Sequence, residues 1–167
     1  MPVRAAFLFL LVLLLPSAAT AIEWVGTVVR IVDGDTLTLL DTSRVRHRIR
    51  LDGIDAPERS QPYGQRARES LEGLTHGRAA RAVCTKTDRY GRAVCSVTVD
   101  GVDVGLEQVR RGLAWHYVRY AREQSPQARI DYAEAGAAAR VARLGLWSDT
   151  QPTAPWDYRR EHAAAAH

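Results

Sequence analysis

The chain is poor in cysteine, lysine and phenylalanine, and this scarcity excludes several classes of protein. Two cysteines among 167 residues are too few for a disulfide-dense miniprotein. The histidines are not suitably spaced to complete a tetrahedral zinc site with them. No segment recurs with a period of about 20–50 residues, which excludes a solenoid. What remains, 46% hydrophobic and 25% charged residues, is the composition of one ordinary globular domain.

Positive charge comes almost entirely from arginine, because Lys86 is the single lysine beside 22 arginines. The formal net charge is +4 and the isoelectric point is near 9.4. A basic surface attracts anionic partners, and the guanidinium fork suits phosphate oxygens. The many alanines suggest that the base composition of the gene contributes to this bias, so it carries little weight alone.

No apolar run is long enough to cross a membrane. The run 5–15 has eleven residues, against about 20 for a spanning helix. It follows Arg4 and precedes Ala19-Thr20-Ala21, a small-x-small cleavage pattern, so a signal peptide is favoured over a membrane anchor. We expect cleavage after Ala21, a secreted or periplasmic protein, and no stable membrane association of the mature chain.

The predicted export affects the expected redox state of Cys84 and Cys95. In an oxidising compartment two cysteines on neighbouring strands can form a disulfide. Two buried free thiols are the alternative, because cysteine is often buried unpaired. The predicted export favours the disulfide.

Strand and helix signals predict a small barrel with attached helices. A turn at Asp33-Gly34-Asp35 separates the first two strands, and the third alternates arginine with apolar residues or histidine. The five predicted strands are 24–32, 36–40, 44–51, 78–85 and 93–99. This count fits an α+β, mainly β fold: a five-stranded OB-type β-barrel with three α-helices.

The three predicted helices are 65–75, a short one ending near Gly112, and a longer one that begins after Ser125-Pro126. We expect one domain over 22–149 and a poorly ordered tail over 150–167. The core stripe predicted for the longest helix is Ile130, Ala133, Ala137, Val141 and Leu144.

Three loops concentrate carboxylates and arginines: 33–36, 50–58 and 87–92. Each alone is compatible with ordinary turn chemistry or a solvated acidic loop. Asp35 and Asp55 carry the hard oxygen ligands that calcium prefers, and could hold one ion. Basic residues dominate between Arg59 and Arg92, which would attract a polyanion.

Taken in order, these loops resemble the staphylococcal nuclease family. The resemblance rests on Val32–Thr36, Arg50 to Glu58 and Asp88–Arg92. Two later segments, Val109–Ala114 and Leu144–Ser148, are also similar to the family's signatures. The resemblance spans about residues 24–149 and implies an OB-type barrel with three helices and a calcium-dependent phosphodiesterase.

The resemblance also implies roles for individual residues. Asp35, Asp55 and the backbone carbonyl of Ala56 would bind Ca²⁺, and Asp33 would orient metal-bound water. Arg50 and Arg92 would hold the scissile phosphate. Glu58 would be the general base or would position the attacking water.

Substrate contacts are expected from aromatic side chains. The resemblance places Tyr90 near the terminal phosphate of the substrate. Tyr117 and Tyr120 are candidates for base stacking or phosphate contact, and packing against the barrel is the alternative.

We therefore expect a monomeric, sugar-non-specific nuclease that cleaves DNA and RNA, favours single strands, and leaves 3′-phosphate and 5′-hydroxyl ends. A non-catalytic oligonucleotide-binding barrel is the main alternative, and a carbohydrate-binding barrel is a third. The acids of the three loops favour the enzyme, because carboxylates repel phosphate unless a cation lies between them.

Overall fold

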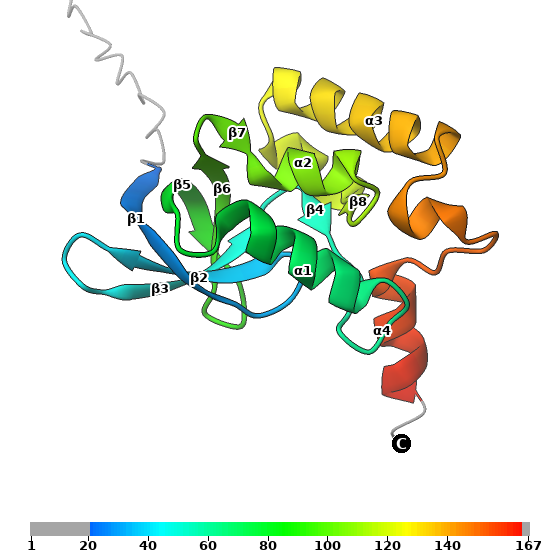
Figure 1. Ribbon diagram of the computed structural model, residues 1–167, viewed down its shortest axis with the longest axis horizontal. Coiled ribbons are helices and arrows are strands. Elements are labelled where there is room, and N and C mark those ends of the chain that lie inside the picture. Colours follow the sequence, from blue (N-terminus) through cyan, green and yellow to red (C-terminus); the bar gives the residue numbers. More distant parts are fainter. Residues whose placement is uncertain (1–20, 165–167) are drawn as a thin grey trace, which may run out of the picture.

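The computed structural model describes residues 21–164, and Figure 1 shows a β-barrel with its helices packed around it. The predicted signal peptide lies outside the described residues except for Ala21. None of the helices within the described range is both long and apolar enough to cross a membrane.

Five strands close the barrel: β1 (Ile22–Ile31), β2 (Thr36–Asp41), β3 (Arg46–Leu51), β5 (Ala79–Thr87) and β6 (Ala93–Val99). Antiparallel pairs give the order β3-β2-β1-β5-β6, and a parallel pairing of β3 with β6 joins the two ends. Closure removes the unpaired edges of the sheet. The predicted α+β, mainly β fold with an OB-type barrel is confirmed.

Three very short strands extend this framework: β4 (Ile54–Asp55), β7 (Val102–Asp103) and β8 (Trp115–His116). β7 pairs antiparallel with β6 at the edge of the sheet, whereas β4 and β8 form a separate two-stranded antiparallel sheet. This second sheet matters for the site because it fixes the backbone of Asp55 directly opposite Trp115.

The barrel interior is apolar. The alternation predicted for the third strand buries Ile49 and Leu51, which face Leu37 and Leu39 of β2 within one core. Val45, predicted on the same side, is half-exposed because it precedes β3.

The helices are α1 (Gly64–Thr75), α2 (Val104–Arg110), α3 (Pro126–Val141) and α4 (Pro155–Ala164), with short 3₁₀ segments η1 (Val118–Glu123) and η2 (Gly145–Ser148). Asp103 caps α2 and Ser125 caps α3, each accepting a backbone N–H with its side chain. Figure 1 shows α1 and α2 against the barrel, with α3 outside α2.

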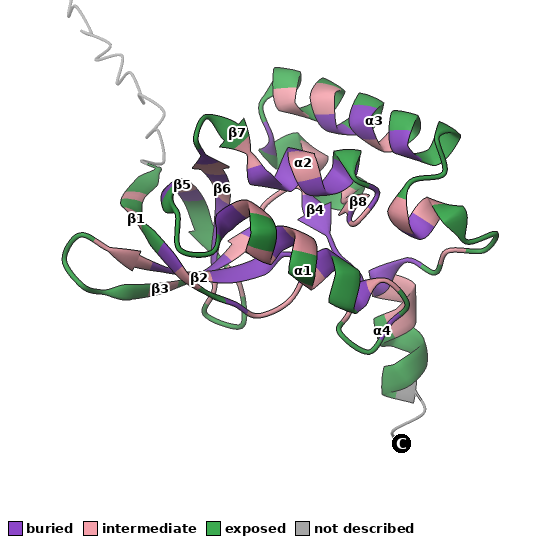
Figure 2. Cartoon of the chain, in the orientation of Figure 1, coloured by how far each residue is buried: buried purple, intermediate pink, exposed green. Residues whose placement is uncertain are grey.

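The predicted core stripe of α3 was wrong. Ile130 and Val141 are 51% and 88% exposed, and Leu144, Ala133 and Ala137 are also exposed. The face toward α2 is instead Tyr132, Ala135 and Ala139, and Figure 2 shows the outer face of the helix exposed. Several faces of this alanine-rich helix are apolar, so spacing could not choose between them. The Tyr132 hydroxyl donates to Asp103 Oδ1 at 2.9 Å, which orients the helix.

The C-terminal segment also differs from the expectation of a poorly ordered tail. Helix α4 begins at Pro155, a residue whose fixed φ suits the first turn. The Trp156 ring packs 5.5 Å from that of Trp115, and Gln61 Nε2 donates to Thr153 O at 2.6 Å. These contacts dock the segment onto the rest of the domain.

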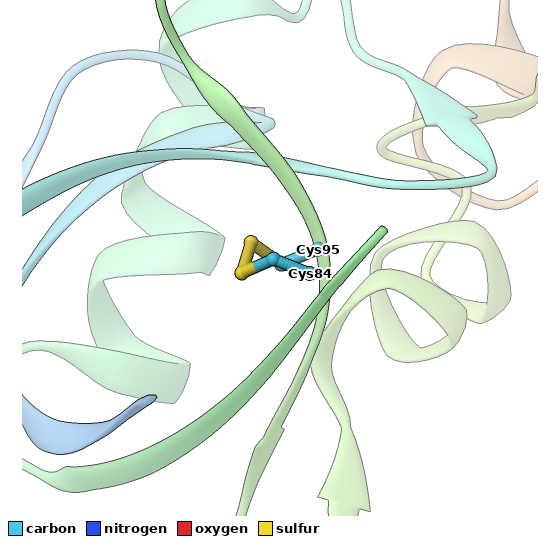
Figure 3. The surroundings of a disulfide bond; sticks show 2 residues. All are labelled: Cys84 and Cys95. Carbon is cyan, nitrogen blue, oxygen red and sulfur yellow. A yellow bond between two sulfur atoms is a disulfide. The ribbon is translucent and has the colours of Figure 1, made fainter. Parts of the chain in front are cut away.

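The predicted disulfide is confirmed. Cys84 and Cys95 face each other on β5 and β6, with Cα atoms 4.0 Å apart. Figure 3 shows both sulfur atoms on the same side of the two strands. Both cysteines are buried in the core of the barrel.

Candidate active site

A cleft of about 710 Å³ lies where the ends of β3 and β4 meet the β1–β2 turn, the β5–β6 turn and the segment after β8. Every residue that the sequence singled out for catalysis, metal binding or substrate contact lines it: Asp33, Asp35, Arg50, Asp55, Ala56, Glu58, Tyr90, Arg92, Tyr117 and Tyr120. The fold therefore brings together loops that are more than 80 residues apart in the sequence.

Arg50, at the end of β3, lies between the two principal acids. Its Nη2 donates to Asp55 Oδ1 at 2.8 Å and lies 3.4 Å from Asp35 Oδ2. Its Nη1 donates to the carbonyl of Ile54 at 2.9 Å. The side chain is only 16% exposed, so its position is set by these bonds rather than by solvent.

The β1–β2 turn holds Asp35 in a network of short contacts. Asp35 N donates to Asp33 Oδ1 at 3.0 Å, and Asp35 Oδ1 accepts from the Thr36 hydroxyl at 2.9 Å. Asp35 Oδ2 accepts from the backbone N of Ala56 at 3.2 Å. Burial, together with the negative charge of Asp35, raises the pKa of Asp33 to about 7.

Asp55 is nearly inaccessible, with 1% of its side chain exposed. Burial raises the pKa of Asp55, and the charge of Asp35 adds to this effect. Hydrogen bonds from Arg159 and the charge of Arg50 oppose it. Two buried carboxylates that share one arginine nitrogen leave negative charge that a cation can neutralise.

The residues fit a calcium site with few protein ligands. Within residues 21–164, no three His, Cys, Asp or Glu side chains are grouped to hold one metal ion. The predicted set has only two carboxylates, from Asp35 and Asp55, and its third member is a carbonyl. Ala56 follows Asp55 in the chain, and its backbone N–H donates to Asp35 Oδ2, so this residue lies beside both acids. Calcium accepts such mixed oxygen ligands and completes its coordination with water.

Arg92 reaches the cleft from the turn between β5 and β6. Asp88 orients it, accepting from Arg92 Nε at 2.8 Å and from its backbone N at 2.9 Å. Arg92 Nη1 donates to Thr36 Oγ1 at 3.1 Å. The guanidinium is thus held at the cleft wall with 16% of the side chain exposed.

Glu58 lies on the loop between β4 and α1. Its backbone N donates to Gln61 Oε1 at 3.1 Å, and the carboxylate keeps 37% of its side-chain surface exposed. Gly64 at the start of α1 lets this loop pass closely, because a Cβ there would collide with the Glu58 carbonyl. The backbone of this loop is therefore held in place, whereas the Glu58 carboxylate remains accessible from the cleft.

The three tyrosines line the cleft mouth in different environments. Tyr90 is 62% exposed and its ring lies under the guanidinium of Arg89. Tyr120 is 40% exposed and packs under Lys86, whereas Tyr117 is half-buried between Tyr120 and Trp156. Tyr117 therefore lines the cleft and also packs against aromatic rings of η1 and α4, and base stacking or phosphate contact by this residue stays a prediction.

Sequence reasoning missed Arg159 of α4. Its Nη2 donates to Asp55 Oδ2 at 2.7 Å, and its Nη1 to Glu58 Oε1 at 2.7 Å and to Asp55 Oδ1 at 3.2 Å. Burial of the guanidinium opposes a rise in its pKa, but the bonds to Asp55 and Glu58 raise it. The sequence did carry signals for this helix. Pro155 suits a helix start, and aromatic and basic residues follow it.

Comparison with known proteins gives a consistent result. A family model described as staphylococcal nuclease homologue matches residues 48–149. Protein ParB of Escherichia coli is 40% identical over 163 residues, covering 91% of this chain and 88% of that protein. Micrococcal nuclease of Shigella flexneri is 36% identical over 158 residues, 89% of this chain and 88% of the relative.

A plant relative is similar over a shorter stretch of the chain. Probable staphylococcal-like nuclease CAN1 of Oryza sativa subsp. japonica is 40% identical over 116 residues, which is 70% of this chain. The chain spans only about a third (33%) of that relative's length.

Proposed function

The chain belongs to the staphylococcal nuclease homologue family and is a phosphodiester-hydrolysing enzyme, and we propose that its reaction depends on calcium and acts on single-stranded DNA and RNA. The observation that carries this proposal is the position of Arg50, whose Nη2 contacts both Asp35 and Asp55 in a cleft that also holds Glu58 and Arg92.

Asp35, Asp55 and the carbonyl of Ala56 would hold the ion. Calcium bound there would neutralise charge on the phosphate and lower the pKa of a coordinated water. Asp33 accepts the backbone N–H of Asp35, so it fixes the backbone of the turn that carries the Asp35 carboxylate, and it would orient metal-bound water. Buried carboxylates would attract the cation more strongly than exposed acids, because charges interact more strongly where water is excluded.

Arg50 and Arg92 would bind the nonbridging oxygens of the scissile phosphate. Each is held by carboxylates of the cleft, Arg50 by Asp55 and Arg92 by Asp88, so both guanidinium groups are positioned before substrate arrives. Positioned donors stabilise negative charge that develops in the transition state, because no reorganisation is needed. A guanidinium also matches two phosphate oxygens at once.

Glu58 would accept a proton from the attacking water or orient that water. Its side chain is 37% exposed, whereas Asp35 and Asp55 are buried, so Glu58 is accessible to solvent in the cleft. Attack opposite the 5′ oxygen would release a 5′-hydroxyl and leave a 3′-phosphate.

The aromatic cleft mouth supports a preference for single strands. Tyr90 and Tyr120 present exposed rings beside Arg89 and Lys86, and a base can stack on such a ring only when it is unpaired. Stacking of this kind tolerates any base, which agrees with an enzyme that accepts DNA and RNA.

We also propose export to the periplasm or the medium. Strand β1 begins at Ile22, the residue directly after the predicted cleavage point, so removal of residues 1–21 would leave all the strands of the barrel intact. The Cys84–Cys95 disulfide is compatible with an oxidising compartment. N-terminal sequencing of the exported protein would test the proposal, and an intact leader would contradict it.

The central experiment incubates residues 22–167 with single-stranded DNA or RNA in about 10 mM calcium, roughly saturating for a weak site. Parallel reactions contain a chelator in place of calcium. We expect fragments only with calcium, and fragments that polynucleotide kinase labels without prior phosphatase treatment, as 5′-hydroxyl ends require. Uncleaved DNA bound over several divalent metals would instead support a non-catalytic binding barrel.

A further inference from the structure

Helix α4 inserts one arginine into the candidate active site. The Arg159 guanidinium contacts both oxygens of Asp55 and one oxygen of Glu58. It thereby links a proposed metal ligand and the proposed base to the end of the chain. Arg159 is 104 residues from Asp55, so this contact depends wholly on the docking of α4.

The hydrogen bonds of Asp55 leave little capacity for a further ligand. Oδ1 accepts from Arg50 Nη2 and Arg159 Nη1, which uses both of its lone pairs. Oδ2 accepts from Arg159 Nη2. A divalent cation at Asp55 would therefore meet a guanidinium on the same carboxylate, and like charges repel strongly where the surroundings exclude water.

We infer that Arg159 competes with the divalent cation for Asp55, and that cation binding displaces Arg159 from this carboxylate. Helix α4 then acts as a cap that holds the acids neutralised in the metal-free enzyme. This inference rests on the proposed calcium dependence, because it assigns Asp55 to the ion.

The contacts indicate which of the two arginines moves. Arg50 belongs to the barrel strand β3, is 16% exposed and also donates to the carbonyls of Leu51 and Ile54. Arg159 is 44% exposed, and among residues 21–164 its guanidinium hydrogen-bonds only to the two acids. Displacement of Arg159 leaves the barrel untouched and returns its charge to solvent.

Helix α4 is held by few contacts, which makes displacement feasible. Its docking depends on the Trp156 ring beside Trp115 and Tyr117, and on the Ser60–Tyr158 hydroxyl contact at 3.1 Å. Figure 2 shows the last turns of the helix exposed, and Figure 1 places it at the periphery beyond the barrel. Peripheral segments with few buried contacts open at low free-energy cost.

The test measures calcium binding by calorimetry, without substrate, in the mature wild-type protein and in Arg159→Gln. Glutamine keeps a good helix former at this position while removing the charge. The matched control is Arg160→Gln, which changes the net charge equally on the neighbouring residue. Arg160 is 75% exposed, and its one ion pair within the described part of the chain is with Asp157.

We expect Arg159→Gln to bind calcium about ten-fold more tightly than wild type, and Arg160→Gln to bind within two-fold of it. In wild type, saturating calcium should also speed hydrogen exchange of the amides in α4. Circular dichroism would establish that both variants keep the barrel.

Equal calcium affinity in wild type and Arg159→Gln would overturn the competition, as would unchanged hydrogen exchange of α4 in wild type. Either result leaves the nuclease proposal standing. Absence of calcium binding in every protein would instead remove the proposed calcium dependence and this inference with it.

Discussion

Arg92 donates a hydrogen bond to the Thr36 hydroxyl at 3.1 Å across 56 residues of sequence. The same hydroxyl donates to Asp35 Oδ1 at 2.9 Å. A continuous chain of donors therefore joins the β5–β6 turn to a proposed metal ligand in the β1–β2 turn. The arginine proposed to bind the phosphate and the proposed ion site are therefore held in one network before substrate binds.

Replacing Arg92 with alanine should reduce cleavage of single-stranded DNA by at least about 10²–10³-fold, the cost of losing one positioned donor to the transition state. Turnover at saturating calcium measures this, and the thermal unfolding midpoint should change little. The control is Arg110→Ala, an arginine 55% exposed on α2 and outside the cleft. Near-wild-type turnover of Arg92→Ala would remove Arg92 from the site.

For Glu58→Gln we expect kcat to fall by about 10²–10⁴-fold, because the amide cannot accept a proton from water. Calcium affinity should change little, since Asp35 and Asp55 are the proposed ligands. Steady-state kinetics and calcium calorimetry separate the two effects. Glu69→Gln, on the exposed face of α1, is the matched control, and an unchanged kcat for Glu58→Gln would refute its role.

Removing the disulfide should cost about 2–4 kcal/mol of unfolding free energy, because the bond closes a loop in the unfolded chain. The paired substitution Cys84→Ala with Cys95→Ala should lower the urea midpoint accordingly. Mass spectrometry of the exported protein should show two hydrogens fewer than the reduced mass. Two alkylatable thiols in the native exported protein would contradict the bond.

Asp52 should make the stability of the domain depend on pH. Burial, together with the charges of Asp103 and Glu123, raises its pKa to about 6 from 3.8. A raised pKa in the folded state means that folding favours the protonated acid, so the destabilisation is absent below about pH 4 and complete above about pH 6.

We therefore expect Asp52→Asn to stabilise the protein by about 1–2 kcal/mol at pH 7.5 and to have little effect at pH 4, allowing for partial solvent screening of this half-buried group. Urea unfolding at the two pH values measures the difference. Equal effects at both would show that ionisation of Asp52 has no part in stability.

Local sequence was sufficient for the five barrel strands and for the residue types in the loops, but it did not predict the two-residue strands β4, β7 and β8. Strict alternation marked β3, Asp33-Gly34-Asp35 marked a turn, and Ser125-Pro126 marked the start of α3. These signals depend on neighbours within a few residues, so they can be read from the sequence without knowledge of the tertiary structure. The order along the chain of three acidic loops, of which the last two also carry arginines, then indicated the family.

The sequence by itself determined which side chains are available for phosphodiester chemistry and in which turns they lie. Only the tertiary structure decided that Tyr132, rather than Ile130, faces α2, and that Arg159 reaches Asp55. The reason is that helix periodicity leaves several faces of an alanine-rich helix equivalent, and an exposed arginine carries no local mark of its partner. Long-range packing determines which face of α3 is buried. The buried carboxylate of Asp55 needs a positively charged partner, which determines where Arg159 binds.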